Sequence, residues 1–469
     1  MTALNPTAGR VVVVGNGPAA HRFVERLRAL GHDGPVTVLG AEGRPAYNRV
    51  LLGSVLDGSL PAGAVSLPEL DAEVHLGCAV TDIDRVQRVV RAEDGREFGY
   101  DALVLATGAR PLVPEVRGLG AERLTALRTL DDCARLVEGT GPVAVLGGGV
   151  LGVETARALL ARGHRVTLVH REEHLMDRQL DEVGGRMLAE RLTALGVDVR
   201  VGVKAGSYRA PVLRLGDGEE VPAERVVACT GVWPNVTLAQ RAGVSINRGV
   251  VVDDLLRTSD ERIHAIGDCA EHRGTTPGLV GAAWEQAEAL AAHLSSGRDA
   301  AHSGTRVVSR LKARGIDLVS VGSVRALGAP DAEIVTLSDP ARGRYAKLAL
   351  RSGRISGAVL LGFPAAIAAV SQLHDRDLPM PADRLSLLLG TPTAVPGAPV
   401  ELPEDAVLCR CNNVTKKSLI TAWHGGARSV AELARATRAT TGCGGCVDDV
   451  GRLCGSLADR IESEREGAA

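Results

Sequence analysis

The chain twice repeats an apolar run, a glycine turn, an amphipathic segment and a second apolar run. Residues 10–14 are mostly valine, residues 21–30 have the apolar spacing of a helix, and residues 36–39 form another β-branched run. The same order returns further along the chain, at 142–146, 153–162 and 165–169. Two strand–helix–strand units of this kind predict an α/β fold with two Rossmann-like dinucleotide-binding domains.

The chain beyond residue 300 has a different pattern. Residues 305–362 contain several strand-like runs and precede a predicted helix near 365–372, so we expect a small α+β domain here. Residues 390–403 carry four prolines and are typical of a linker. The segment that follows holds five of the nine cysteines and predicts a small C-terminal module.

Formal charge is nearly balanced, at -2 from 54 basic and 56 acidic side chains, so no overall field attracts nucleic acid or an anionic membrane. The scarcity of aromatic residues argues against platforms that stack bases. The N-terminus lacks the features of a signal peptide, and glycine or charge interrupts every apolar run well short of a membrane span. We therefore expect a soluble cytoplasmic protein that binds its ligands at local sites.

The first glycine turn has the composition of a pyrophosphate site. Gly15 and Gly17 follow the strand, and Ala20 replaces the third glycine of the fingerprint. Backbone N–H groups and a helix N-terminus can meet the phosphates at such a turn, because no Cβ blocks the approach. Glu42 lies where a carboxylate binds the adenosine ribose hydroxyls. A glycine turn that binds nothing is the alternative.

The second turn has all three glycines and predicts a nicotinamide dinucleotide. Its contact residues are expected to be Gly147, Gly149, Val150, Leu151 and Gly152. His170 and Arg171 stand where NADH-specific proteins usually have a carboxylate. A cation there favours NADPH, whereas Glu172 and Glu173 come slightly late to bind the ribose of NADH, which stays open. Arg171 could also be an ordinary surface residue.

Four cysteines near the C-terminus have the spacing of a ligand set: Cys409 and Cys411, then Cys443 and Cys446 after a 31-residue spacer. Four thiolates bind either a 2Fe-2S cluster or zinc. Because zinc sites draw each pair from a C-x(2–4)-C turn, the C-x-C half favours the cluster, with zinc as the alternative. Six basic residues against one acid between 409 and 442 favour a reduced cluster, although they could equally form a docking patch or a solvated helix face.

Three more segments, at 45–52, 101–111 and 263–270, resemble the pyridine nucleotide-disulfide oxidoreductase superfamily in sequence and order. The resemblance covers about residues 10–300 and implies FAD at the first turn and NAD(P)H at the second. The FAD contacts it implies, together with the first turn, are Gly15, Gly17, Pro18, Ala19, Glu42, Arg49, Val80, Thr107, Gly108, Gly267, Asp268 and Trp284. For NAD(P)H it adds Glu154, His170, Arg171 and Gly231 to the five turn residues.

Three of these residues also have structural explanations. Asp268 is implied to bind a flavin ribityl hydroxyl or phosphate, and it could also cap a helix. Trp284 is implied near the flavin pyrimidine edge or, alternatively, belongs to the core. Glu154 is implied near the nicotinamide, or it is a solvated helix residue.

No catalytic residue is predicted. No C-x-x-C pair lies beside either turn, so thiol–disulfide exchange is not expected. Hydride transfer to FAD needs stacking and orientation rather than a proton donor, which fits the lack of an acid–base constellation.

The four-cysteine segment resembles the bacterioferritin-associated ferredoxin domain, a small helical 2Fe-2S module, over residues 407–460. Thr415 and Ser429 are expected to cap two short helices, and 447–461 to form a third. Cys454 has no partner at ligand spacing and is expected to be a free thiol. The predicted domains are 8–115 with 236–300 for FAD, 116–235 for NAD(P)H, 304–390 for the α+β domain, 391–404 for the linker and 405–462 for the 2Fe-2S domain.

NAD(P)H supplies two electrons and a 2Fe-2S cluster carries one, so the order of parts predicts an electron path through FAD to an external acceptor. Residues 305–322, with 45–52, look like assimilatory nitrite reductase large subunits and the electron-transfer subunits of assimilatory nitrate reductase. No further cysteine set is present for sirohaem and a 4Fe-4S cluster, so we expect terminal reduction on a partner, a molybdenum nitrate reductase. A subunit of an opine or hydrogen cyanide synthase-type amine dehydrogenase and a zinc-bound redox sensor are the alternatives.

Overall fold

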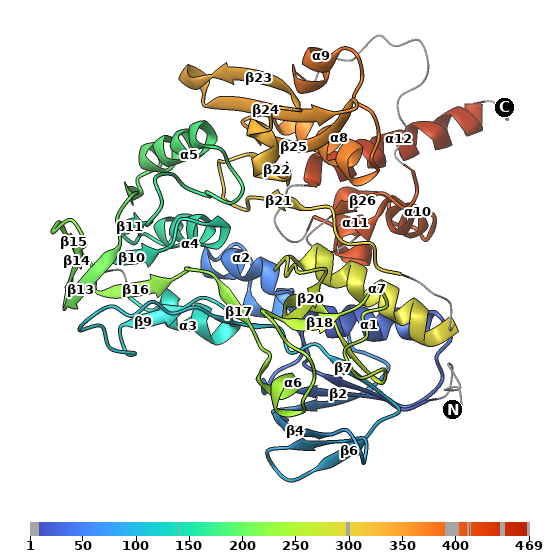
Figure 1. Cartoon of the computed structure of the whole chain (residues 1–469). Coiled ribbons are helices and arrows are strands. Elements are labelled where there is room, and N and C mark those ends of the chain that lie inside the picture. Colours follow the sequence, from blue (N-terminus) through green and yellow to red (C-terminus); the bar gives the residue numbers. More distant parts are fainter. Residues whose placement is uncertain are drawn as a thin grey trace.

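The computed structural model describes residues 9–139, 141–296, 301–389, 403–409, 412, 414–440 and 446–466. Most of the predicted linker at 391–404 lies outside these residues, as do Cys411 and Cys443. Within the described residues, no helix combines the length and the apolar character needed to cross a membrane. Four folded parts are visible along the colour gradient of Figure 1.

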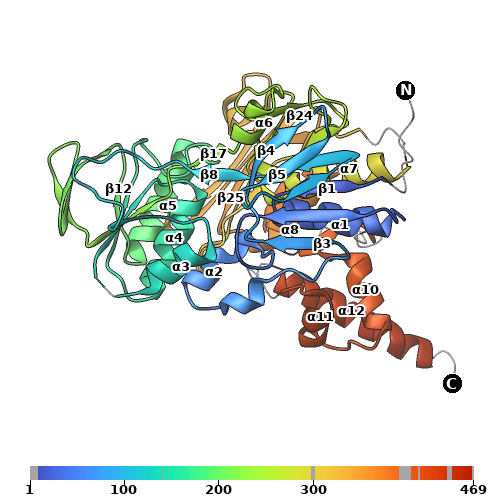
Figure 2. The same ribbon diagram turned by 90° about the horizontal axis from the view of Figure 1, so that it is seen from below.

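The first part is a parallel five-stranded sheet in the order β19-β7-β1-β2-β3, with α1 and α7 packed together on it (Figures 1 and 2). Four β-branched residues make β1 fully buried, as expected for a central strand of a covered parallel sheet. Its elements are β1 (Val11–Val14), α1 (Pro18–Ala29), β2 (Val36–Gly40), β3 (Glu73–Leu76), β7 (Ala102–Leu105), β19 (Ile263–Ala265) and α7 (Val280–Ser296).

Smaller elements complete this part. A three-stranded antiparallel sheet, β4-β5-β6, lies beside it, and η1 and α2 follow β2. Their bounds are η1 (Arg49–Leu51), α2 (Leu52–Leu56), η2 (Ala62–Val65), β4 (Val80–Asp84), β5 (Val89–Ala92), β6 (Glu97–Gly99), α6 (Thr237–Arg241), β18 (Val250–Val252), η3 (Gly267–Cys269) and β20 (Ala270–His272).

The second part repeats the same design with a sheet in the order β12-β11-β10-β16-β9. Antiparallel pairing of β8 with β17 joins the two chain segments that cross between the first and second parts. The bounds are β8 (Ala109–Pro111), β9 (Leu124–Ala126), α3 (Leu130–Val137), β10 (Val143–Leu146), α4 (Val150–Ala161), β11 (Val166–Val169), α5 (Glu182–Ala194), β12 (Asp198–Arg200), β13 (Ala205–Arg209), β14 (Val212–Leu215), β15 (Glu220–Pro222), β16 (Arg225–Ala228) and β17 (Val232–Pro234).

The third part is an antiparallel sheet in the order β21-β22-β25-β24-β23, covered by α8. Its elements are β21 (Val308–Arg310), β22 (Leu318–Gly322), η4 (Val324–Gly328), β23 (Glu333–Asp339), η5 (Pro340–Arg342), β24 (Arg344–Arg351), β25 (Arg354–Leu361), α8 (Pro364–Asp375) and α9 (Arg384–Leu389). The predicted helix near 365–372 is therefore the centre of α8.

The fourth part is a helical module that lies beside α1 and α2 (Figure 2). Thr415 and Ser429 cap its first two helices through hydrogen bonds to Ser418 N and Glu432 N, as predicted. Its elements are β26 (Val407–Cys409), β27 (Val414–Thr415), α10 (Lys416–His424), α11 (Val430–Thr437) and α12 (Val447–Glu466).

The cores show how the parts are joined. The first part has its own apolar core, whereas one continuous core connects the second part, α2, one face of the third part and the helical module. The module is therefore packed onto the rest of the molecule by buried apolar surface rather than by polar contacts alone.

Candidate functional site

A cavity of about 1210 Å³ runs between the first and second parts. Both glycine turns line it, at the ends of β1 and β10 and the starts of α1 and α4. Two helix N-termini thus point their free N–H groups at one cavity, an arrangement that favours anionic phosphate groups.

Glycine is sterically required in the first turn. Gly15 has φ +112°, and a Cβ there would lie 2.2 Å from the carbonyl oxygen of Ala106. A Cβ on Gly17 would meet no atom within 4 Å. Gly15 therefore keeps the turn tight, and Gly17 leaves the space in front of α1 open for a ligand.

In the second turn, two glycines are sterically required and a third leaves space for a ligand. A Cβ on Gly147 would lie 2.5 Å from Cys229 O, and one on Gly152 only 1.7 Å from Gly147 O. Gly149, like Gly17, has open space beside it. Gly152 does not line the cavity, so its place in the fingerprint reflects the close packing of α4 against the turn.

His170 is hydrogen-bonded to the backbone of the second turn. Its Nδ1 accepts a hydrogen bond from Gly148 N at 3.0 Å, and its Nε2 lies 3.2 Å from Asp177 Oδ1. Burial lowers the pKa of His170 despite the nearby Asp177 carboxylate. A neutral ring with the proton on Nε2 satisfies both contacts, so His170 is a buried hydrogen-bond acceptor, and Arg171 is the cation at this position.

Arg171 lies at the rim of the same cavity. Its guanidinium is mostly exposed and binds Glu172 at 2.7 Å. Lys204 also lines the cavity. Arg171 and Lys204 therefore both add positive charge to the lining of the cavity.

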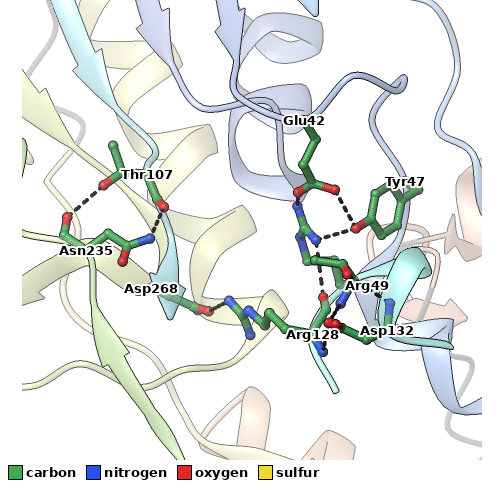
Figure 3. Close-up of polar contacts among 9 residues, drawn as sticks. Glu42, Tyr47, Arg49, Thr107, Arg128, Asp132, Asn235 and Asp268 are labelled. Atoms are coloured by element: carbon green, nitrogen blue, oxygen red, sulfur yellow. Dashed lines mark hydrogen bonds and ion pairs between the residues drawn. The ribbon is translucent and has the colours of Figure 1, made fainter. Parts of the chain in front are cut away.

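A polar cluster built on Glu42 lines the cavity at the end of β2 (Figure 3). Tyr47 donates its hydroxyl to Glu42 at 2.7 Å, and Arg49 binds both Glu42 and the Tyr47 hydroxyl. Burial raises the pKa of Tyr47 to about 12, so the hydroxyl keeps its proton. The segment after β2 is thereby fixed to the Glu42 carboxylate.

Asp268 is held by a partner that the sequence did not suggest. Arg128, just before α3, binds Asp268 at 2.7 Å across the cavity (Figure 3). Asp268 lies inside η3, whose N-cap is Ile266, so it does not act as a helix cap. Thr107 and Asn235 exchange two hydrogen bonds of 2.9 and 2.8 Å and hold the end of β7 to the segment after β17.

Glu154 is almost completely buried, which excludes the solvated alternative. It accepts a hydrogen bond from the backbone of Lys312 at 2.8 Å, and the Lys312 ammonium lies 3.4 Å away. Both residues line the cavity. Lys312 of the third part therefore adds a cation to the cavity, and Glu154 of the second part holds Lys312 in place.

The structure brings most of the predicted contact residues to one cavity. Those that line it are Gly15, Gly17, Pro18, Ala19, Glu42, Arg49, Thr107, Gly108, Gly147, Gly149, Val150, Leu151, Glu154, His170, Arg171, Gly231, Gly267 and Asp268. Val80, Gly152 and Trp284 are absent from its lining. Trp284 lies on α7 among buried residues.

Lining residues that the sequence did not indicate include Tyr47, Arg128, Asn235 and Lys312. Tyr47 lies within the segment 45–52 that carries the family resemblance, but its hydrogen bond to Glu42 depends on tertiary geometry. Arg128 and Lys312 carry no local signal, since their partners are 140 and 158 residues away in sequence.

Cys409 and Cys446 lie in the continuous core of the module, with exposed fractions of 0% and 3%. The other two predicted ligands are outside the described residues, and the described ones contain no group of three metal-binding side chains. Two buried thiols on either side of α10 and α11 fit a site held by the four predicted cysteines. Cys454 is partly exposed, and its Sγ lies 3.8 Å from Arg428 O.

Three family models match successive parts of this chain. Residues 9–287 match the family model for pyridine nucleotide-disulphide oxidoreductases, 308–371 the rubredoxin NAD+ reductase C-terminal domain, and 407–454 the BFD-like [2Fe-2S] binding domain. The putidaredoxin reductase of a covalent complex with putidaredoxin is a structural neighbour, with TM-score 0.72 and 27% identity over 81% of this chain and 95% of the other.

Two curated relatives from Bacillus subtilis (strain 168) cover 93% of this chain. One is a nitrite reductase [NAD(P)H] that is 32% identical, and the match covers 56% of its length. The other is an assimilatory nitrate reductase electron transfer subunit that is 31% identical, and the match covers 58% of its length. The chain thus spans little more than half the length of these relatives.

Two dinucleotide turns on one cavity, joined to a thiol-rich module, define a flavoprotein of the FAD- and NAD(P)H-binding class. The chain belongs to the pyridine nucleotide-disulphide oxidoreductase family and ends in a BFD-like [2Fe-2S] binding domain. This confirms the predicted fold class, the predicted FAD, NAD(P)H and 2Fe-2S cofactors, and the preference for the cluster over zinc.

Proposed function

We propose that this chain takes electrons from NAD(P)H and passes them through FAD and its 2Fe-2S cluster to a terminal reductase of nitrate assimilation. The observation that carries the proposal is the union, in one chain, of two dinucleotide turns on one cavity with a docked cysteine module. When bound, FAD accepts two electrons and a proton as hydride and releases single electrons.

Nitrate reductase is the proposed acceptor, with nitrite reductase as the second candidate. The relative named an electron transfer subunit of nitrate reductase supports the first, and the three relatives named as bacterial nitrite reductases support the second. A molybdenum-containing catalytic subunit is the proposed partner for nitrate.

The residues of this chain bind and orient rather than exchange protons. Backbone N–H groups at the two turns would hold the pyrophosphates, Glu42 the adenosine ribose of FAD, and Arg171 the 2′-phosphate of NADPH. Asp268 and Arg128 are proposed to bind the central part of FAD. Val80 and Trp284 are proposed to act at the flavin edge through neighbouring residues, since they do not line the cavity.

Anaerobic mixing of the purified protein with NADPH or NADH tests the proposal. We expect the flavin absorbance to bleach first and the cluster signal of electron paramagnetic resonance to appear afterwards. Purified nitrate reductase and nitrite reductase catalytic proteins, added separately, should then reoxidise the cluster to different extents. The variants Cys409→Ser and Cys446→Ser should keep flavin reduction and lose electron delivery.

Three results would contradict the proposal. Flavin reduction by amino acids but not by either nucleotide would indicate an amine dehydrogenase subunit. Zinc rather than iron in the purified protein would indicate a redox sensor. Reoxidation of the cluster by neither catalytic protein would remove nitrate assimilation from the assignment.

A further inference from the structure

One short segment separates the cavity from the cysteine module. On one side, Tyr47, Arg49, Val50 and Leu52 line the cavity. Asn48, which lies between them in sequence, does not line it and is 1% exposed. Its side-chain Nδ2 donates instead to Asn412 Oδ1 of the module at 3.3 Å. The two sites are therefore in contact through residues 47–53.

Asn412 belongs to the cysteine end of the module. It comes three residues after Cys409 and directly after Cys411 in sequence. Its own Nδ2 donates to Arg438 O at 2.6 Å, and the Arg438 guanidinium reaches Ala64 O at 3.4 Å. A chain of polar contacts thus runs from Asn48 through Asn412 and Arg438 to η2 of the first part.

Apolar packing also holds the module against residues 47–65. Cys409 and Cys446 share one buried core with Leu51, Leu52 and Val65, which lie in or next to η1, α2 and η2. Burial of this apolar surface stabilises the docked module. The Asn48–Asn412 hydrogen bond fixes how the module is oriented, because hydrogen bonds depend on distance and angle. The Cys409 and Cys446 thiols are therefore buried in the same apolar core as residues next to the cavity wall.

We propose that Asn48 and Asn412 are positioning residues that dock the cysteine end of the module on residues 47–53, so that electrons pass from flavin to cluster within one chain. This inference rests on the proposed function. Two electrons and one proton leave NAD(P)H as hydride for the flavin. The two electrons leave the flavin one at a time, the external acceptor reoxidises the cluster between the two transfers, and the proton that arrived with the hydride is released to solvent.

An amide pair suits this position. Asn48 Oδ1 also accepts from Val50 N at 3.1 Å, which caps η1, while its Nδ2 serves the module. One side chain thus fixes both the cavity wall and the docked loop. Neither amide titrates, so the contact carries no charge that would compete with electron arrival at the cluster.

Asn48→Ser is the decisive variant. A serine hydroxyl can still cap η1 but is too short to reach Asn412, and the module itself is unchanged. Asn412→Ala removes the same contact from the other side, together with the bond to Arg438. Ser429→Ala is the matched control, because it weakens the N-cap of α11 inside the module without touching the flavin-binding part.

Rapid mixing with NAD(P)H under anaerobic conditions provides the kinetic measurement. We expect Asn48→Ser and Asn412→Ala to bleach flavin at the wild-type rate and to reduce the cluster at least about tenfold more slowly, with a rate that falls as glycerol raises the viscosity. Ser429→Ala should reduce the cluster at the wild-type rate. Hydrogen exchange in residues 45–67 should accelerate in the first two variants only, which is independent of turnover.

The outcomes separate the two proposals. Cluster reduction at the wild-type rate in Asn48→Ser, with normal flavin bleaching, would overturn the docking proposal and leave the proposed function intact. Slow cluster reduction in Ser429→Ala as well would overturn it too, because module stability would then explain the effect. Failure of either nucleotide to bleach the wild-type flavin would refute the proposed function itself.

Discussion

Gly149 and Gly152, three residues apart in the second turn, differ in what lies next to their α-carbons. A Cβ on Gly152 would overlap Gly147 O, so Gly152→Ala should destabilise the protein by about 1–3 kcal/mol. Gly149 has open space beside it, so Gly149→Ala should keep the wild-type melting temperature and raise the KM for NAD(P)H. Calorimetry and steady-state kinetics on the pair check this. Equal melting temperatures for the two variants would contradict the packing explanation.

His170 offers a second test at the residue scale. His170→Ala removes the acceptor for Gly148 N, and the loss of about 1–2 kcal/mol should raise the KM for NAD(P)H roughly tenfold. His170→Asn keeps an acceptor at a similar position and should stay near the wild-type value. The measurement is KM with electron acceptor in excess.

The same residue predicts a pH dependence. Since burial lowers its pKa below the ordinary 6.5, His170 is neutral at pH 7 and gains a proton only as the pH falls through the lowered value. The wild-type KM should therefore be constant from pH 8 to 6.5 and rise at lower pH, whereas His170→Asn should lack this rise. A rise of equal size in both proteins would show that another group titrates.

Between elements, the contact of Glu154 on α4 with Lys312 before β22 joins the second and third parts. Lys312→Met removes the ammonium group from the buried Glu154 carboxylate and leaves it the hydrogen bond from the backbone N–H of residue 312. Removing one member of a buried pair costs about 3–5 kcal/mol, and partial exposure of Lys312 reduces this to about 1–3 kcal/mol. Differential scanning calorimetry should show the loss.

Glu154→Gln in the Lys312→Met background supplies the control. A neutral amide can still accept from the backbone, so the double variant should recover most of the lost stability. If the double variant is as unstable as Lys312→Met, the charge of Glu154 is not the cause.

At the scale of elements, strands, turns and helix caps could be predicted from the sequence, because each has a local pattern. Contacts between residues far apart in the sequence could not be predicted. The valine run of β1, the glycine turns and the caps at Thr415 and Ser429 each carry a local pattern, and the structure shows all of them. The Arg128–Asp268 and Lys312–Glu154 pairs join residues 140 and 158 positions apart, and no periodicity marks them. The burial that keeps His170 a neutral hydrogen-bond acceptor is likewise a tertiary property.

For the whole molecule, buried histidines predict the acid limit of stability. His264 is 2% exposed beside His293 and Arg257, and burial lowers its pKa to about 3. Because the unfolded chain binds this proton near pH 6.5, the stability is present above that value and is lost as the pH falls. Between pH 7 and 5 this group alone removes about 2 kcal/mol.

Urea unfolding at the two pH values measures the effect. His264→Gln should lose about 2 kcal/mol less than the wild type over this range. The exposed His424→Gln, on α10, is the control and should follow the wild type. An unchanged pH dependence in His264→Gln would assign the loss to other groups, among them His302, whose pKa burial lowers to about 4.

The strand order of the first sheet also determines when that sheet can be completed during synthesis of the chain. Its strand β19 pairs with β7, residue 263 against residue 103, so the intervening 116–235 must be synthesised before that sheet is complete. The second part has all its strands in one stretch and can fold while the first still lacks an edge. On the ribosome, all five strands of the second sheet can therefore be present while the first sheet still lacks its edge strand β19.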